Sequence, residues 1–180
     1  LIRGFLEQGR IDLLISKPVS RNQLLSGHLF GVVLTVLVLA SYLVGGVWVA
    51  LSLKTGVWFP HVLMSIPLIV IMFTVMYSVI LTVTVMTRSN GLALILAYGL
   101  IFISAIMAAH EQILPVLSPT AKTAFNTMYH LLPNFVEVVI IQAQLVTGEA
   151  VASWYSLISS SLFGAVIYGL GFIWFNRRDF

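Results

Sequence analysis

Residues 9–31, GRIDLLISKPVSRNQLLSGHLFG, combine charge, a proline break, a helix start and the entry into a long apolar run. Three apolar side chains in this stretch recur at the i, i+3, i+4 spacing of one helical face; they are Ile11, Leu14 and Ile15. The charged residues lie mostly off that face, and they are Arg10, Asp12 and Lys17. The pattern predicts a short amphipathic helix that lies in the membrane interface or against a partner, not across the bilayer.

A proline separates this helix from the next one. Pro18 removes a backbone donor and disfavours helical geometry at the residue before it. Ser20 and Gln23 form an S-x-x-Q capping box, which predicts that a new helix begins at Arg21 and continues into the apolar segment after His28. An ordinary interfacial helix leading into a membrane span explains the same pattern, so the pattern alone leaves that alternative open.

Composition places the whole chain in the bilayer. Of its 180 residues 59% are hydrophobic and only 8% are charged, and its mean hydropathy is +1.05. A soluble domain carries about 25% charged residues. We therefore predict an all-α polytopic membrane protein. The absence of cysteine excludes disulfides, thiolate metal sites and a cysteine nucleophile.

Four segments are long and apolar enough to cross a membrane, namely residues 29–53, 62–86, 92–109 and 155–175. We expect them to form one transmembrane domain, with residues 1–28 as a coupling loop before the first span and residues 176–180 as a tail. The long connection, residues 110–154, contains an apolar helix at 135–147. Thirteen helical residues reach only about 20 Å, so this helix is expected to be interfacial or re-entrant.

The basic residues orient the predicted bundle. With four spans, one side holds seven of them, which are Arg3, Arg10, Lys17, Arg21, Arg88, Arg177 and Arg178. The other side holds Lys54 and Lys122. Because cytoplasmic loops carry the excess of Lys and Arg, both ends of this sequence are expected in the cytoplasm.

Small and hydroxylated residues suggest where helices meet. Small residues spaced four apart, typical of close helix packing, are Gly27 and Gly31, Ser160 and Gly164, and Ser161, Ala165 and Gly169. A polar row on the second span consists of Thr74, Ser78 and Thr82. Its hydroxyls either bond to their own or a neighbouring helix, or line a substrate path.

No catalytic or metal-binding pattern is present. The sequence lacks G-x-x-x-x-G-K-[ST] and H-E-x-x-H motifs, and its histidines are scattered without metal-ligand spacing. The predicted spans contain no charged residue, which argues against an ion-coupled carrier. We expect no enzyme activity, no metal and no cofactor in this chain.

The opening stretch resembles the first cytoplasmic loop of permease subunits of type-2 ABC exporters. That loop has the form G-x-[IL]-[ED]-L-L-[LI]-[SA]-K-P-[VI]-S-R followed by a glycine and a basic residue. The residues that match are Gly9, Ile11, Asp12, Leu13, Leu14, Ser16, Lys17, Pro18, Val19, Ser20, Arg21 and Gly27. His28 departs from the pattern, since Lys or Arg is common there. YHLLPNF at 129–135 and the terminal FNRRDF are similar to later parts of the same permeases.

The resemblance implies a six-span permease whose first two spans would precede Leu1. It implies a second permease copy or a related permease as partner, and separate ABC ATP-binding subunits that hold ATP and Mg²⁺. The residues it assigns to ATPase coupling are Arg10, Ile11, Asp12, Leu14, Ile15, Lys17, Pro18 and Arg21. The location implied is the cytoplasmic (inner) membrane, with no nucleic-acid partner. Two alternatives stay open, a non-transporting scaffold or mechanotransmission protein and, with less support, an ion-coupled carrier.

Overall fold

The computed structural model describes residues 21–177, and this part of the chain is helical with no strand. The predicted all-α fold is therefore confirmed. The elements in chain order are α3 (Arg21–Thr55), η1 (Pro60–Met64), α4 (Ser65–Thr87), α5 (Asn90–Met107), α6 (His110–Ile113), η2 (Leu114–Val116), α7 (Pro119–Leu131), α8 (Phe135–Thr147) and α9 (Tyr155–Arg177). The amphipathic helix predicted before Pro18, and the last three residues of the tail, lie outside the described residues.

Four helical segments of the described chain are long and apolar enough to span a membrane: Leu25–Thr55, Pro60–Thr87, Asn90–Met107 and Tyr155–Phe175. They overlap the four predicted ranges, although α5 ends two residues before the predicted boundary at 109. The helix expected at 135–147 is α8. A further helix, α7, precedes it and was not anticipated; the two are bent by 59° at the break between them, as in a broken span or a re-entrant loop.

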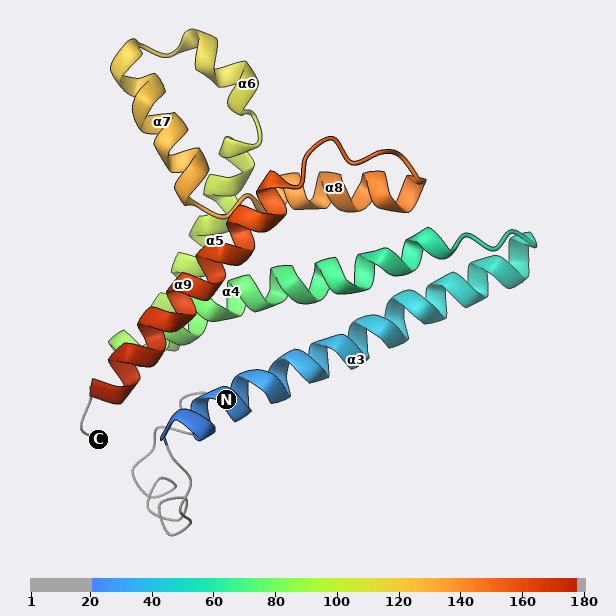
Figure 1. The fold of residues 1–180 in the computed structure, drawn as a ribbon, viewed down its shortest axis with the longest axis horizontal. Helices are drawn as coiled ribbons and strands as arrows, with labels where there is room; N and C mark the ends of the chain where they lie inside the picture. Colours follow the sequence, from blue (N-terminus) through green and yellow to red (C-terminus); the bar gives the residue numbers. More distant parts are fainter. Residues whose placement is uncertain (1–20, 178–180) are drawn as a thin grey trace.

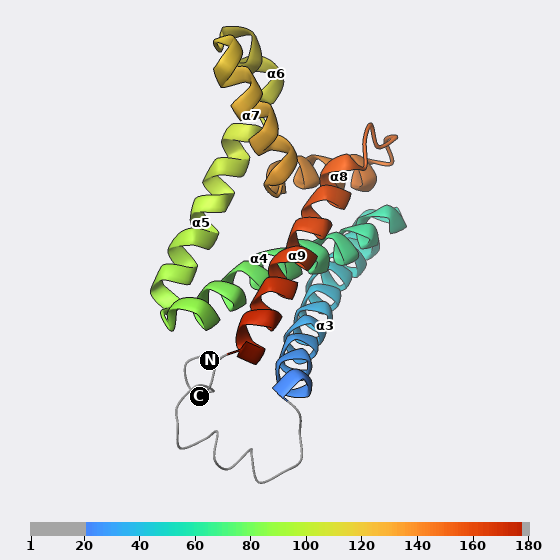
Figure 2. The same cartoon turned by 60° about the vertical axis from the view of Figure 1, so that its left-hand side comes forward.

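The two ends of the bundle differ in what they contain. The start of α3, the turn between α4 and α5, and the end of α9 lie together, and we call this the near end (Figures 1 and 2). At the opposite, far end α6 and α7 project beyond the spans, while α8 lies across the bundle (Figures 1 and 2). Each spanning helix runs in the opposite direction to the one before it, so after four spans the end of α9 returns to the side on which α3 begins.

The tightest packing joins α4 to α9. A Cβ added at Gly164 would lie 3.0 Å from Val75 Cγ2, and one added at Gly171 would lie 3.2 Å from Thr82 Cβ. Both pairs are separated by seven residues, which is two helical turns, so the same faces meet twice. Thr82 Oγ1 also donates a hydrogen bond across this seam to the Ile167 carbonyl, at 2.9 Å. Because Gly164 and Gly171 have no side chain, the backbones of α4 and α9 can approach closely.

Helix α3 contacts α4 and α9 and also meets η1 at the far end. At the near end Leu25 packs in a core cluster whose other buried members are Tyr77, Leu81, Val85 and Phe175. Most of the remaining α3 side chains are exposed, with Ala40 and Ser52 as buried exceptions. Apolar side chains of a spanning helix can face lipid without cost. One face of α3 therefore packs along its length, and its other faces are exposed within the described chain.

Candidate functional site

The predicted ATPase-coupling residues lie at or beyond the start of the described chain. Those outside it are Arg10, Ile11, Asp12, Leu14, Ile15, Lys17 and Pro18. Arg21, the last of the set, is the first residue of α3, at the near end. Since α3 is one continuous helix up to Thr55, the stretch that precedes it is joined directly to the first span.

The near-end cluster contains a polar contact between α3 and α4. His28 Nε2 and the Tyr77 hydroxyl lie 2.8 Å apart, within hydrogen-bond distance. Tyr77 is buried, and its ring stacks on Phe73 one turn away, with centroids 5.9 Å apart and planes 13° apart. Tyr168 of α9 packs against the same cluster. Its hydroxyl is buried and has no hydrogen-bond partner in the described part of the chain.

The hydroxyl row on α4 makes contacts within the bundle. Thr74 donates to the Val70 carbonyl at 2.7 Å, and Ser78 donates to the Val75 carbonyl at 2.7 Å. Thr82 instead bonds across to α9. These are the helix contacts that the sequence offered as one of its two interpretations. A lining role for Thr74, Ser78 and Thr82 stays a prediction.

The small residues predicted to pack helices divide into two groups. Ser160 and Gly164 are buried between α9 and its neighbours. By contrast, a Cβ added at Gly27, Gly31 or Gly169 would meet no atom within 4 Å, and Ala165 is exposed. These four positions therefore make no close helix contact within the described chain. Gly171, which does, was missed; its spacing of seven from Gly164 was the available signal.

At the far end, serines of two spans hold the start of α8. The backbone N–H of Asn134 donates to Ser160 Oγ of α9 at 3.0 Å, and that of Val136 donates to Ser104 Oγ of α5 at 3.1 Å. Helix N-termini leave such donors unsatisfied. Asn134 also donates from Nδ2 to the Tyr129 carbonyl at 3.2 Å. The break between α7 and α8 is thus bonded to α5, α7 and α9.

A carboxylate beside this break joins three elements. Glu137 Oε2 of α8 accepts hydrogen bonds from the Tyr129 hydroxyl of α7, at 2.9 Å, and from Ser156 Oγ of α9. Burial and the hydrogen bond to Glu137 raise the pKa of Tyr129 to about 12. His110 stacks on the Tyr129 ring with centroids 4.3 Å apart, and His130 Nδ1 contacts the Tyr155 hydroxyl.

We call these residues the far-end cluster: Glu137, Tyr129, Ser156, His110, His130 and Tyr155. The sequence shows the histidines scattered without metal-ligand spacing and did not predict this cluster. Among the described residues no group of three or more His, Cys, Asp or Glu side chains could hold a metal ion. The hydrogen bonds of the cluster hold α7, α8 and α9 together, which indicates a structural role.

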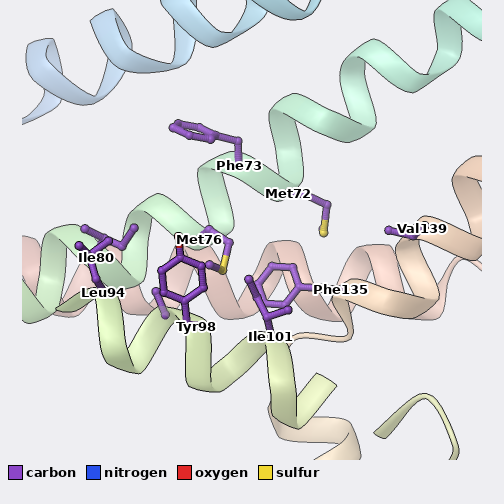
Figure 3. A pocket seen from close by; sticks show the side chains of 10 residues that line it. Met72, Phe73, Met76, Ile80, Leu94, Tyr98, Ile101, Phe135 and Val139 are labelled. Carbon is purple, nitrogen blue, oxygen red and sulfur yellow. The ribbon is translucent and has the colours of Figure 1, made fainter. Parts of the chain in front are cut away.

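An apolar groove of about 400 Å³ lies between α4, α5 and α8 (Figure 3). Its walls are Met72, Phe73, Met76, Ile80, Leu94, Ala97, Tyr98, Ile101, Phe135 and Val139. Phe73 points toward α3, whereas Met76 points toward α5 (Figure 3). Methionine side chains adapt to differently shaped apolar partners, so the groove suits apolar contacts and offers no catalytic group.

The structure thus defines a multi-pass helical membrane protein whose polar contacts join helices at both ends of a bundle. A family model of ABC-2 family transporter proteins matches residues 1–180. The chain therefore belongs to the ABC-2 transporter family, and the membership supports a permease role. Members of this family generally work in a membrane with an ATP-binding subunit. Neither a search of curated proteins nor a search of solved structures returned a match.

Proposed function

We propose that this chain is the membrane-spanning permease subunit of an ATP-driven ABC exporter. A second permease copy or a related permease completes the substrate path, and a separate ABC subunit binds and hydrolyses Mg-ATP. The observation that carries the proposal is the family match over the whole sequence, residues 1–180. No nucleotide-binding motif occurs in the chain, which fits a division of labour between two kinds of subunit.

The proposed docking element is the 9–21 stretch. It has an apolar helical face for packing and charged residues that set its register, and it directly precedes α3 in the sequence. A stiff element tied to a span can pass a push from the ATPase to the bundle. Arg10, Ile11, Asp12, Leu14, Ile15, Lys17 and Pro18 would supply this contact together with Arg21.

The orientation follows from charge. Arg21, Arg88 and Arg177 all belong to the near end of the described bundle, whereas Lys54 and Lys122 belong to elements that reach the far end. By the positive-inside rule we place the near end in the cytoplasm. The ATPase would then dock below α3, and α7 and α8 would face the outside of the inner membrane.

A pull-down tests the class of function. The full-length gene product is solubilised in detergent and used as bait, and the proteins bound to it are identified by mass. We expect a co-purifying ATPase with a nucleotide-binding loop. A preparation free of any ATPase would contradict the proposal and favour a scaffold or a carrier instead.

Substitutions in the loop test the coupling element. Asp12→Ala combined with Arg21→Ala should leave membrane insertion intact but detach or uncouple the ATPase. Lys122→Ala is the matched control, because this exposed lysine lies in α7 at the far end. Full ATPase association and full transport in the Asp12/Arg21 variant would contradict the assignment of the loop.

A further inference from the structure

We propose that the contact between His28 and Tyr77 is the joint through which movement of the coupling loop reaches α4 and the apolar groove. The two residues would be positioning residues of the transport cycle. This inference rests on the proposed function, since it assumes that an ATPase moves the stretch before α3.

The first step is the attachment of α3. The helix continues from Arg21, so any displacement of the preceding loop moves its first turns. These turns meet α4 and α9 in the near-end cluster, where Leu25 is buried and Leu29 and Val32 are partly buried. Further along, one face of α3 continues to pack, with Ala40 and Ser52 buried. The near-end cluster is the packing contact closest to the loop, so it is the first to receive a displacement of α3.

The second step concerns the hydrogen bond between His28 and Tyr77, which, unlike apolar packing, depends on the direction in which the two groups meet. Apolar side chains in a cluster can slide past one another with little change in contact, because dispersion and burial are non-directional. The 2.8 Å contact between His28 Nε2 and the Tyr77 hydroxyl fixes one register of α3 on α4. Separating the pair would leave the phenol of a buried residue without this partner, which is costly away from water.

The third step leads from Tyr77 to the groove. The Tyr77 ring stacks on Phe73, with centroids 5.9 Å apart, and Phe73 is part of the groove wall. Phe73 lies on the side of α4 that faces α3, and Met76 on the side that faces α5 (Figure 3). A shift of α3 that carries Tyr77 would thus move or rotate α4 at the residues that form the groove.

The cluster also contains a matched control. Tyr168 of α9 packs against the same buried residues, but its buried hydroxyl has no partner in the described chain. Tyr77→Phe and Tyr168→Phe each remove one phenol oxygen from one cluster, and only Tyr77→Phe removes a contact between α3 and α4. A general effect of losing a hydroxyl there should appear in both variants.

The test follows groove movement without needing a transport substrate. Residues 1–180 contain no cysteine, so Val139→Cys places the one thiol of this part of the chain on the exposed α8 wall of the groove; the permease without this substitution gives the background labelling. The full-length permease and its ATPase are reconstituted in phosphatidylethanolamine–phosphatidylglycerol vesicles. The rate of maleimide labelling is measured with and without Mg-ATP and vanadate. Binding of the ATPase subunit and vanadate-sensitive ATP hydrolysis are recorded for every variant.

We expect nucleotide trapping to change the labelling rate in the Val139→Cys background. Adding Tyr77→Phe or His28→Leu should reduce that change about five-fold, the factor expected for one net hydrogen bond. Tyr168→Phe should leave the nucleotide-dependent change in labelling rate intact. His28→Gln, which keeps a hydrogen-bonding side chain, should retain most of that change. The double variant His28→Leu/Tyr77→Phe should be no worse than either single variant.

The outcomes separate the two proposals. If the unsubstituted permease binds no ATPase, the proposed function fails and this inference with it. If it binds the ATPase and hydrolyses ATP, but Tyr77→Phe and Tyr168→Phe respond alike, the joint is wrong and the proposed function stands. A Tyr77→Phe protein that loses ATPase binding would also overturn the joint, because the contact would then act on assembly.

Discussion

Helix α9 is joined to its neighbours in two different ways along its length. Toward the near end Gly164 and Gly171 let it approach Val75 and Thr82 of α4 closely. Toward the far end, Ser156 donates a hydrogen bond to Glu137 of α8, and Ser160 accepts one from the backbone N–H of Asn134, the residue before α8. The first attachment depends on shape and the second on polar partners. The comparison teaches that one helix can be positioned by close backbone packing at one part and by hydrogen bonds at another.

The largest effect is expected where backbones approach. Gly171→Ala places a methyl group 3.3 Å from Thr82 Cα, so α4 and α9 must separate, at a cost of about 1–3 kcal/mol of unfolding free energy. Gly169→Ala, two residues away, meets no atom within 4 Å and should be neutral or stabilising. Thermal unfolding in detergent, followed by fluorescence-detected size exclusion, measures both. Equal Tm values would disprove the close α4–α9 seam.

The next effect concerns the cap of α8. Ser160→Ala removes the acceptor for the Asn134 N–H and should lower the unfolding free energy by about 1 kcal/mol. Ser161→Ala is the control, because its hydroxyl bonds to the Leu157 carbonyl of its own helix; it should change stability by less than about 0.5 kcal/mol. Chemical denaturation in mixed micelles resolves the pair. A larger loss for Ser161→Ala would reverse our assignment of the cap.

A smaller effect should depend on pH. Tyr129 has its pKa raised from 10.0 to about 12 in the folded protein. The unfolded chain therefore releases this proton first, so the stability contributed by neutral Tyr129 is complete below pH 10 and is lost as pH rises toward 12. Unfolding temperatures measured across this window should fall more for the natural protein than for Tyr129→Phe. Tyr42→Phe, which alters an exposed tyrosine of α3, should behave like the natural protein.

The smallest effect is expected on α3. Gly31→Ala meets no atom within 4 Å in the described chain, so the unfolding free energy of the single permease should change by about 0.5 kcal/mol or less. The predicted packing role of Gly27 and Gly31 would then concern a second copy. Native mass spectrometry of the detergent-solubilised protein tests that role. A lower Tm with unchanged oligomeric mass would show a contact within one chain.

Hydropathy and local breaks predicted most of the fold. Four apolar runs and a short helix at 135–147 agree with α3, α4, α5, α8 and α9. Helix α7 was not anticipated, although Pro119 lies in its first turn, where proline is favoured. These features are local, so a single stretch of sequence contains the information that determines them.

The sequence by itself determined the class of protein, because apolar length and scarce charge leave a helical membrane bundle as the stable solution. Only the tertiary structure decided that Gly171 packs while Gly169 does not, that Glu137 joins Tyr129 to Ser156, and that His28 meets Tyr77. The physical reason is that the rotation of each helix about its own axis is not fixed by its sequence alone. Every face of a spanning helix is apolar enough for lipid, so the periodic pattern is weak. The angle at which each helix meets its neighbours then selects the contacts.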